Sequence, residues 1–585
     1  MKTSGKDWTH IDRRSVLWGL GNTVAALSLS GCSLHPSGSI SSGTPPGGSV
    51  PLAVDAHCHV FNGRDLPVYG FLDHTAIQNP FLQKIAAPLV LMISDSVESL
   101  AKTYTQELEA LRHILSDPTA SPRYVSQPDE FTKFVSFTVS RFIEHRTSFG
   151  GRASLGDPRT EENDRFIVHL HRSFGLIPQA IDKSEVQRFM MSKQQDLTAQ
   201  IVKPLDLSLD IAYVRQFFRW AYELTQYRFQ IANALTELFG DPETKLRFLA
   251  PAIIDLHYWM ADPNFDQEPT SILQQAELMG LISLVQPAGR MIHGFVAFDP
   301  WRYLDDLQRG RRPNALDVFK MAVEKYGFIG VKLYPAMGFK PMNNAVLGDN
   351  DFPAGLRALG PKVGVKLDEA LAEVYLYCAQ HDVPIMAHCA ETNGAMPQYS
   401  LRASPHFWVP VLEKYKNLRL NLGHFGGIWA FYGADPICTT KEHSTTGEHW
   451  TCVIAAMLAR YPNLYADVGD FAQVLDRTNE EASEDQQVFA NLKKLTESDP
   501  LLTSRMMYGS DWVALDYEPG NQKYYSMMRQ KFADQFGTEK TVGLLGGNAA
   551  NFLGLGPGQA TRQRLTAFYH DNRRQPPDLG AVPST

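Results

Sequence analysis

The sequence predicts an α/β fold, a (β/α)8 barrel of eight parallel strands surrounded by helices, with a large, mostly helical insertion after the first strand. The main observation is that short apolar segments alternate with segments of helical periodicity, as in βαβ units. A second observation is that histidine and aspartate residues stand where several of these apolar segments end. In such a barrel the carboxyl ends of all strands meet on the face that carries the active site. The predicted strands are residues 52–60, 248–256, 292–298, 328–334, 383–388, 418–424, 464–468 and 505–508.

Helical segments precede several of these strands. The helix that begins at Ala315 ends at Gly327, a favourable C-terminal residue, directly before the fourth strand. Further helices are predicted at residues 367–381, 407–416 and 450–461. Strands and helices in this alternation are what the barrel requires.

The pattern of residues 1–31 indicates an export signal. Arg13 and Arg14 form a twin-arginine pattern, and an apolar run follows them as far as Leu29. The residues before Cys32 resemble a lipoprotein processing box, which predicts a lipid anchor on Cys32 followed by a flexible linker over 32–50. We therefore expect a periplasmic or membrane-anchored lipoprotein. The alternative is an ordinary cleaved signal in which Cys32 is incidental.

The composition is typical of a soluble globular protein, with 44% hydrophobic and 20% charged residues among 585. Residues 1–31 carry four basic and two acidic side chains, so the mature chain would have 51 basic and 61 acidic residues, a net charge of −10. This balance argues against nucleic acid as a partner, and membrane contact is expected only through Cys32. Cysteines are few, and only Cys438 and Cys452 lie where a disulfide is plausible.

Nearly 190 residues separate the first two strands, so residues 61–247 are predicted to fold as a helical cap subdomain. The barrel then consists of residues 51–60 and 248–555, with a C-terminal tail at 556–585. The clearest helical pattern of the insertion covers residues 209–239. We interpret it as a buried helix of the cap in preference to a helix on a membrane surface. Because the insertion leaves the carboxyl end of a strand, it should overhang the mouth of the site.

The first strand carries half of a metal site. His57 and His59 are two residues apart, so their imidazoles project from one face of the strand. A catalytic metal needs about three protein ligands and one open position. His388 ends the fifth strand, His424 ends the sixth, and Asp511 follows the eighth. Five such side chains at strand ends predict a metal site at the carboxyl face of the barrel.

The combined pattern resembles the amidohydrolase superfamily, specifically its amidohydrolase-related (amidohydrolase 2) branch. The resemblance rests on the two-histidine pattern of the first strand and on residues 330–333, His388, His424, 509–511 and 546–553. It implies that His57, His59, His388 and Asp511 hold a divalent metal, usually one Zn²⁺. Such an ion lowers the pKa of bound water to about 7.

Two of these residues are assigned catalytic roles. Asp511 is expected to accept the proton of the metal-bound water and pass it to the leaving group, the alternative being an Asp that caps a turn. His424 is expected to hydrogen-bond the substrate oxygen and stabilise an oxyanion, in preference to serving as a second-metal ligand.

Lys332 has two interpretations. It ends the strand on which binuclear relatives carry a carboxylated lysine that bridges two metals, so a second ion would follow if Lys332 were carboxylated. Otherwise Lys332 pairs with an acidic residue or an anionic substrate.

Several nearby residues have less specific interpretations. Asp55 either orients an imidazole or is a polar residue at the start of the strand, and Cys58 and Cys389 should pack outward against helices. His257 and His293 fall outside the pattern and are read as core or surface residues. The candidate substrate contacts follow strands at the carboxyl face and are Tyr334, Glu391, Trp429 and Trp512.

These features predict a metal-dependent hydrolase that cleaves an amide, ester or lactone bond of a small molecule. The branch also contains non-oxidative decarboxylases, which is the first alternative, because fold does not determine the reaction. The second alternative is a non-catalytic, metal-containing binding protein. The sequence does not identify the substrate or the oligomeric state.

Overall fold

A computed structural model describes residues 52–76, 92–117, 130–138, 211–237, 246–264, 266–287, 289–390, 394–427, 449–475, 479–512, 514–517 and 520–579. The predicted export signal and linker, Cys32 included, lie outside these residues. Among the described residues, no helix combines the length and hydropathy needed to cross a bilayer.

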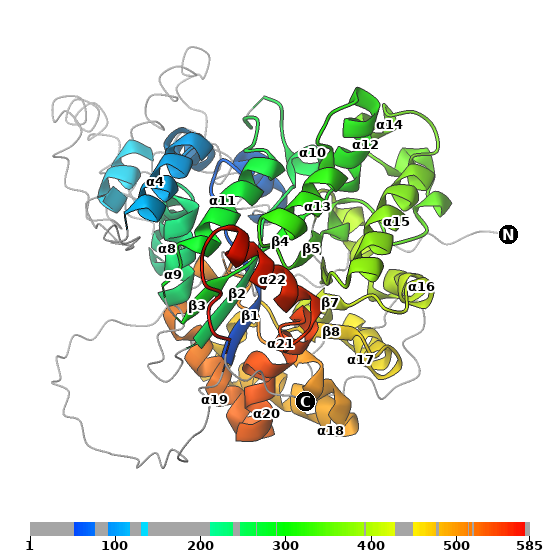
Figure 1. The fold of residues 1–585 in the computed structure, drawn as a ribbon. Helices are drawn as coiled ribbons and strands as arrows, with labels where there is room; N and C mark the ends of the chain where they lie inside the picture. The colour runs from blue at the N-terminus through cyan, green and yellow to red at the C-terminus, as the bar shows by residue number, and fades with distance from the viewer. Residues whose placement is uncertain are drawn as a thin grey trace, which may run out of the picture.

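The described strands form one parallel sheet in the order β1-β2-β4-β5-β6-β7-β8-β9, with β3 pairing beside β2. Each predicted strand is present, and the third is split into β3 and β4 at His293 and Gly294. The eight-stranded barrel is therefore confirmed (Figure 1). The strands are β1 Leu52–His59, β2 Leu246–Ala252, β3 Arg290–Ile292, β4 Phe295–Ala297, β5 Gly330–Leu333, β6 Ile385–His388, β7 Leu420–Gly423, β8 Leu464–Asp467 and β9 Met506–Met507.

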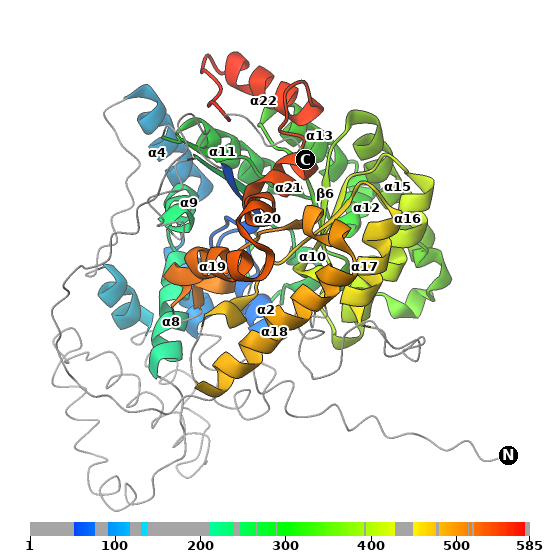
Figure 2. The same ribbon diagram turned by 90° about the horizontal axis from the view of Figure 1, so that it is seen from below.

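Helices surround the strands, as Figure 2 shows for the ring that runs from α11 and α13 to α15, α17 and α19. The predicted helices over 315–327, 367–381, 407–416 and 450–461 correspond to α13, α15, α16 and α17. The helices that follow β2 are α10 His257–Met260, α11 Ile272–Leu284, α12 Pro300–Arg309, α13 Ala315–Lys325, α14 Ala354–Arg357, α15 Val363–His381, α16 Val409–Lys414, α17 Trp450–Arg460, α18 Asn479–Ser498, α19 Tyr524–Phe536, α20 Thr538–Val542, α21 Asn548–Leu553 and α22 Ala560–Asp571.

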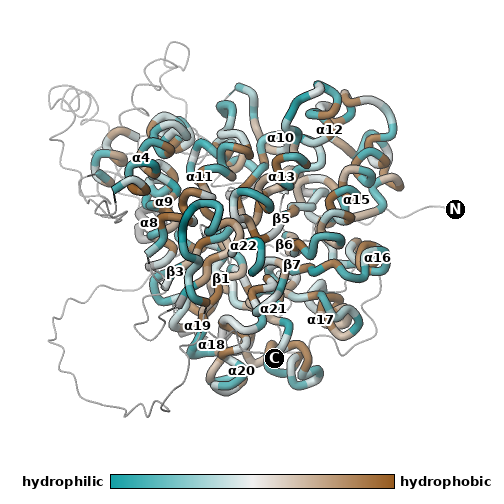
Figure 3. The backbone as a smooth tube through the Cα atoms, viewed as in Figure 1, coloured by the Kyte–Doolittle hydropathy of each residue, from teal (hydrophilic) through white to brown (hydrophobic). Residues whose placement is uncertain are grey.

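Two apolar clusters follow from the alternation of side chains along the strands. Phe248, Met386 and Met507 belong to the cluster inside the barrel, where Phe552 of α21 stacks on Phe295. Residues of the opposite face, such as Val331, pack in the larger cluster beneath the helices. Apolar stretches follow the central strands while α20 and much of α22 are hydrophilic (Figure 3).

The first and last strands are joined by backbone hydrogen bonds. The amide of Ala56 donates to the carbonyl of Tyr508 at 3.1 Å, and the amide of His59 donates to the carbonyl of Trp512. The buried carboxylate of Asp55 adds a side-chain link, because it accepts the hydroxyl of Ser510 at 2.6 Å. These bonds complete the circuit of strands.

The residues predicted as a C-terminal tail contain α22, which packs on the barrel. Its Tyr569 hydroxyl lies 3.0 Å from Nε2 of His293, whose Nδ1 lies 2.8 Å from the carbonyl of Gly327. His293 is completely buried, which agrees with the core interpretation.

The described parts of the insertion after β1 are helical, as predicted. They include α2 Val68–Phe71, a π-helical turn η1 Leu72–Ala76, α4 Tyr104–Ser116, α8 Ile211–Glu223 and α9 Arg228–Glu237, with further helix at 92–100 and 130–138. Both views place α4, α8 and α9 along one flank of the barrel. The prediction of a single helix over 209–239 is wrong in one respect. The segment forms two helices, and the residues between Glu223 and Arg228 are not α-helical.

The reason for this break is a buried ion-pair network. The guanidinium of Arg228 at the start of α9 donates to both oxygens of Asp65 at 2.7 and 2.6 Å and to Glu107 of α4 at 2.7 Å. All three side chains are at most 2% exposed. Asp65 belongs to the loop that follows β1, so the network ties two insertion helices to the strand that carries His57 and His59.

Replacing Arg228 should therefore destabilise the protein strongly. Arg228→Ala leaves two buried carboxylates without a counter-charge, for which we expect a loss of about 3–5 kcal/mol. The measurement is the free energy of unfolding in urea. Arg312→Ala is the control, because its ion pair with Asp317 is largely exposed and should contribute under about 1 kcal/mol. Equal effects of the two substitutions would contradict a structural role for the network.

Candidate metal centre

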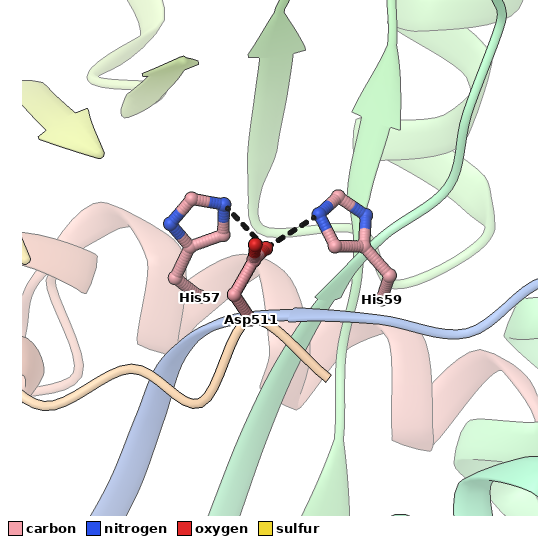
Figure 4. Close-up of side chains that lie close together, drawn as sticks. All are labelled: His57, His59 and Asp511. Atoms are coloured by element: carbon pink, nitrogen blue, oxygen red, sulfur yellow. Dashed lines mark ion pairs between the residues drawn. The ribbon is translucent and has the colours of Figure 1, made fainter. Parts of the chain in front are cut away.

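The carboxyl ends of the strands bring the predicted polar residues to one place. His57 and His59 end β1, His388 ends β6, His424 follows β7 and Asp511 follows β9. In Figure 4 the rings of His57 and His59 stand on either side of the Asp511 carboxylate. Asp511 Oδ1 lies 3.4 Å from Nε2 of His57 and 3.2 Å from Nε2 of His59.

The hydrogen-bond partners of these rings identify the nitrogens that carry a proton. Nδ1 of His57 lies 2.9 Å and 3.0 Å from the two oxygens of Asp467, and Nδ1 of His59 lies 3.2 Å from the carbonyl of Ala252. Carboxylates and carbonyls only accept, so both Nδ1 atoms are assigned as donors. Each Nε2 atom then turns a lone pair toward Asp511.

Three acceptors that face one another call for a cation between them. Two ligand atoms bound to one Zn²⁺ at about 2.1 Å stand roughly 3.0–3.4 Å apart, depending on the angle. The separations of 3.2 and 3.4 Å fall in this range. His57, His59 and Asp511 thus fit a shared divalent metal.

The protonation states also suit a metal. Burial lowers the pKa of His57 to about 4, with the charge of Lys332 acting in the same direction and Asp467 opposing it, so His57 is neutral at pH 7. Burial alone would raise the pKa of Asp511, but His424, His57 and His59 outweigh it and hold the pKa well below its usual range. Neutral imidazole and ionised carboxylate are the forms that bind metal.

His388 stands beside this cluster with one nitrogen unused. Its Nδ1 lies 3.2 Å from Nε2 of His424, whereas its own Nε2 is buried and has no hydrogen-bond partner among the described residues. Tyr334 stacks on the ring at a centroid distance of 4.2 Å. A buried nitrogen without a partner is unfavourable unless a ligand satisfies it, which agrees with a role for His388 as the fourth ligand. His388 nevertheless lies outside the compact group formed by the other three.

Asp467, the last residue of β8, was not identified from the sequence. Besides the ring of His57, it accepts Nδ2 of Asn421 at 2.6 Å and the backbone amides of His424 and Gly469 at 3.1 and 2.9 Å. These partners keep it ionised although it is fully buried. The available signal was a carboxylate at the end of an otherwise apolar predicted strand.

Glycines surround the ring of His57. A Cβ atom on Gly423 would lie 2.7 Å from its Cε1, one on Gly509 would lie 2.8 Å from its Cβ, and one on Gly469 would lie 3.2 Å from its Nδ1. These glycines end or follow β7, β8 and β9. The imidazole therefore occupies space that side chains on three strands would otherwise fill.

Lys332 lies directly beneath the cluster. Its Nζ is 2.8 Å from Nε2 of His57 and 3.3 Å from Sδ of Met386, and no carboxylate of the described residues lies within 4 Å of it. Burial lowers its pKa to about 8, although Asp511 and Asp467 oppose the shift. The predicted pairing with an acidic residue is thus not seen in the described part of the chain.

The structure also locates the remaining predicted residues. Asp55 contacts no imidazole ring, because a register shift between Asp55 and Cys58 interrupts the alternation along β1, and Asp55 instead accepts hydrogen bonds from Ser510. Cys58 and Cys389 pack in the cluster beneath the helices, as predicted. Trp512 is buried at 1% exposure.

Some predictions fall outside the described residues. These are the substrate contacts Glu391 and Trp429 and the lipidation site Cys32. Cys452 is disulfide-bonded, and its predicted partner Cys438 likewise lies outside the described residues.

Solved structures with some likeness to this chain include an amidohydrolase and a decarboxylase. An amidohydrolase from Burkholderia multivorans with bound HEPES is 13% identical, with a TM-score of 0.32 over 55% of this chain and 87% of that chain. The 5-carboxyvanillate decarboxylase of Sphingomonas paucimobilis is 14% identical, with a TM-score of 0.34 over 60% and 91% of the two chains. Similarity this low identifies no reaction.

A search of the curated proteins found no match to this chain. Residues 289–555 match the family model described as Amidohydrolase. The matched range contains Lys332, His388, His424 and Asp511, and β1 completes the cluster from outside it. The chain is thus similar to this family over the part of the barrel that runs from β3 to α21.

Proposed function

We propose that this protein is a metal-dependent hydrolase that cleaves an amide, ester or lactone bond of a small molecule. The observation that carries the proposal is the convergence of Nε2 of His57 and Nε2 of His59 on Oδ1 of Asp511, at 3.4 and 3.2 Å. His388 would add a fourth ligand through its unpartnered Nε2. A bound zinc ion would supply a water with a pKa of about 7 and polarise the scissile carbonyl.

Asp511 is the residue best placed to move the proton. Its side chain keeps 13% exposure, whereas that of His57 is completely buried, so Asp511 faces the side from which a substrate arrives. It is ionised at neutral pH, which is the form that a proton acceptor must have. The backbone holds this carboxylate in place, since the amide of Asp511 donates to the carbonyl of His57 at 2.7 Å.

The oxyanion role expected for His424 stays a prediction. In this structure Nδ1 of His424 lies 3.2 Å from the carbonyl of Gly469, and Nε2 lies 3.2 Å from Nδ1 of His388. Both ring nitrogens thus have protein partners, and a substrate oxygen would have to displace one of them.

Export and lipid anchoring through Cys32 belong to the same proposal, supported by the sequence pattern alone. The insertion is proposed to shape the entrance, because α8 packs against residues Ala514–Tyr517, directly after the site. The enzyme would then act on small molecules outside the cytoplasm.

Metal binding can be tested with a glycine that supports His57. In Gly423→Ala the new methyl group would overlap the ring of His57, and we expect zinc affinity to fall about tenfold or more. The measurement is competition with a chromophoric chelator. Gly348→Ala is the control, since the nearest atom to its Cβ would be 3.5 Å away. Unchanged affinity in Gly423→Ala would remove His57 from the ligand set.

The reaction can be tested with Asp511→Asn, a residue type that tolerates the φ of +51° at this position. We expect turnover to fall by about 10²-fold or more, because the amide cannot accept the proton. Zinc-loaded wild type and variant are assayed on amides, esters, lactones and aromatic acids in ¹⁸O-water, with carbon dioxide monitored.

The isotope separates the alternatives in that assay. Hydrolysis places ¹⁸O in the product acid, whereas a decarboxylase releases carbon dioxide without incorporating it. Turnover that survives in Asp511→Asn would contradict the proton shuttle. Zinc binding without turnover of any substrate would favour a binding protein.

Zinc stoichiometry tests the role of Lys332. We expect one zinc per chain even with bicarbonate present. A second cluster of residues that could hold a metal consists of His57, His424 and Asp467, but these residues already form hydrogen bonds with one another. The measurement is metal analysis after dialysis against saturating zinc. Two equivalents in the wild type and one in Lys332→Ala would establish a carboxylated, bridging lysine instead.

A further inference from the structure

β8 supplies none of the proposed metal ligands, yet its last residue and the turn after it contact two imidazoles of the site. We propose that this segment, residues 467–469, sets the ring tautomers of two ligands, His57 directly and His388 through His424. The inference rests on the proposed metal site and assigns Asp467 and His424 as positioning residues. It concerns how the site is held and does not depend on which reaction follows.

The first connection runs from Asp467 to His57. Both carboxylate oxygens lie within 3.0 Å of Nδ1, so the proton of the neutral ring resides on Nδ1. The opposite nitrogen, Nε2, is left with its lone pair turned toward Asp511. A metal ligand whose other ring nitrogen donates to a carboxylate is held in orientation and is more basic.

The second connection runs from the carbonyl of Gly469 through two rings. A carbonyl oxygen only accepts, so Nδ1 of His424, 3.2 Å away, carries the proton of that ring. With one proton on each ring, Nε2 of His424 accepts and Nδ1 of His388 donates to it at 3.2 Å. The remaining nitrogen of His388 is Nε2, the buried atom without a partner.

Both connections are held by the same carboxylate. Asp467 accepts the backbone amides of Gly469 and His424, so it fixes the carbonyl that begins the second connection and the residue that continues it. His424 and Asp470 have φ values of +64° and +59°, in a region that few non-glycine residues adopt. Gly469 has no room for a side chain, since a Cβ would lie 3.0 Å from Asp467 Oδ1.

The tautomers can be observed without metal. In protein labelled with ¹⁵N-histidine and stripped of metal, ring-nitrogen chemical shifts at neutral pH distinguish Nδ1–H from Nε2–H rings. We expect His57 and His388 to carry the proton on Nδ1. Each signal is assigned with a variant in which that one histidine is replaced. A proton on Nε2 of either ring in the wild type would overturn the proposal.

Paired substitutions test the positioning roles through zinc affinity. Asp467→Ala and His424→Ala remove the acceptors, and we expect zinc affinity to fall about 10- to 100-fold. Asp467→Asn and His424→Gln keep a carbonyl oxygen at the same reach, so they should restore most of the affinity and the Nδ1–H tautomers. Asp306→Asn is the control, because Asp306 is also buried but accepts the backbone amide of Ala315 at the start of α13, and it should bind zinc as the wild type does.

The outcomes separate this inference from the proposed function. If both His424 variants bind zinc normally and lose only turnover, His424 acts on the substrate and the positioning role is wrong. If Asp467→Ala does not fold, the tautomers of the wild type and of His424→Ala still decide the question. A wild-type protein that shows the expected tautomers but binds no zinc would refute the metal site and leave the hydrogen-bond assignment standing.

Discussion

Lone pairs that face one another at about 3 Å are the constraint on which this structure depends. Nε2 of His57, Nε2 of His59 and the carboxylate of Asp511 repel unless a cation lies between them, so the protein has to hold them together. Hydrogen bonds at the other nitrogen of each ring hold the rings in place. Asp467 accepts from Nδ1 of His57, and the carbonyl of Ala252 accepts from Nδ1 of His59. Burial is what makes these bonds effective, because water does not compete for the donors and acceptors.

Closure of the barrel and formation of the site are the same event. Asp511 follows β9 and His57 belongs to β1, and the hydrogen bond between their backbones joins the two ends of the sheet. The link from Asp55 to Ser510 lies next to this bond and strengthens the same junction. The insertion is anchored to the same strand through Asp65 and Arg228. β1 therefore connects the ligands, the closure of the barrel and the helices on its flank.

Much of this arrangement was predictable from the sequence because strand ends in a parallel barrel converge. Alternation placed His57 and His59 on one face, and counting strands placed His388, His424 and Asp511 nearby. Asp467 was missed because a single carboxylate in a strand does not reveal its partner, which comes from a strand 410 residues away in the chain. The interpretation of Asp55 as a residue that orients an imidazole could not be rejected from the sequence, because a shift in pairing register leaves no signal in the pattern of residues. The end of the predicted helix at Glu223 likewise depends on a buried ion pair between distant segments.

Lys332 adds a requirement for metal binding, because it contacts a nitrogen that the metal would use. Its Nζ donates to the lone pair of His57 that a metal would use, so an ammonium group and a cation compete for one nitrogen. Two unit charges 4 Å apart repel by about 4 kcal/mol at an effective dielectric constant of about 20. Burial lowers the pKa of Lys332 to about 8, so the neutral amine is easier to form than in a free lysine but the ammonium still predominates at pH 7. Only the neutral amine can add carbon dioxide, and only it leaves Nε2 of His57 available to a metal. Both interpretations of the site therefore require Lys332 to lose a proton, and what distinguishes them is whether a second ion finds unused ligands beside it.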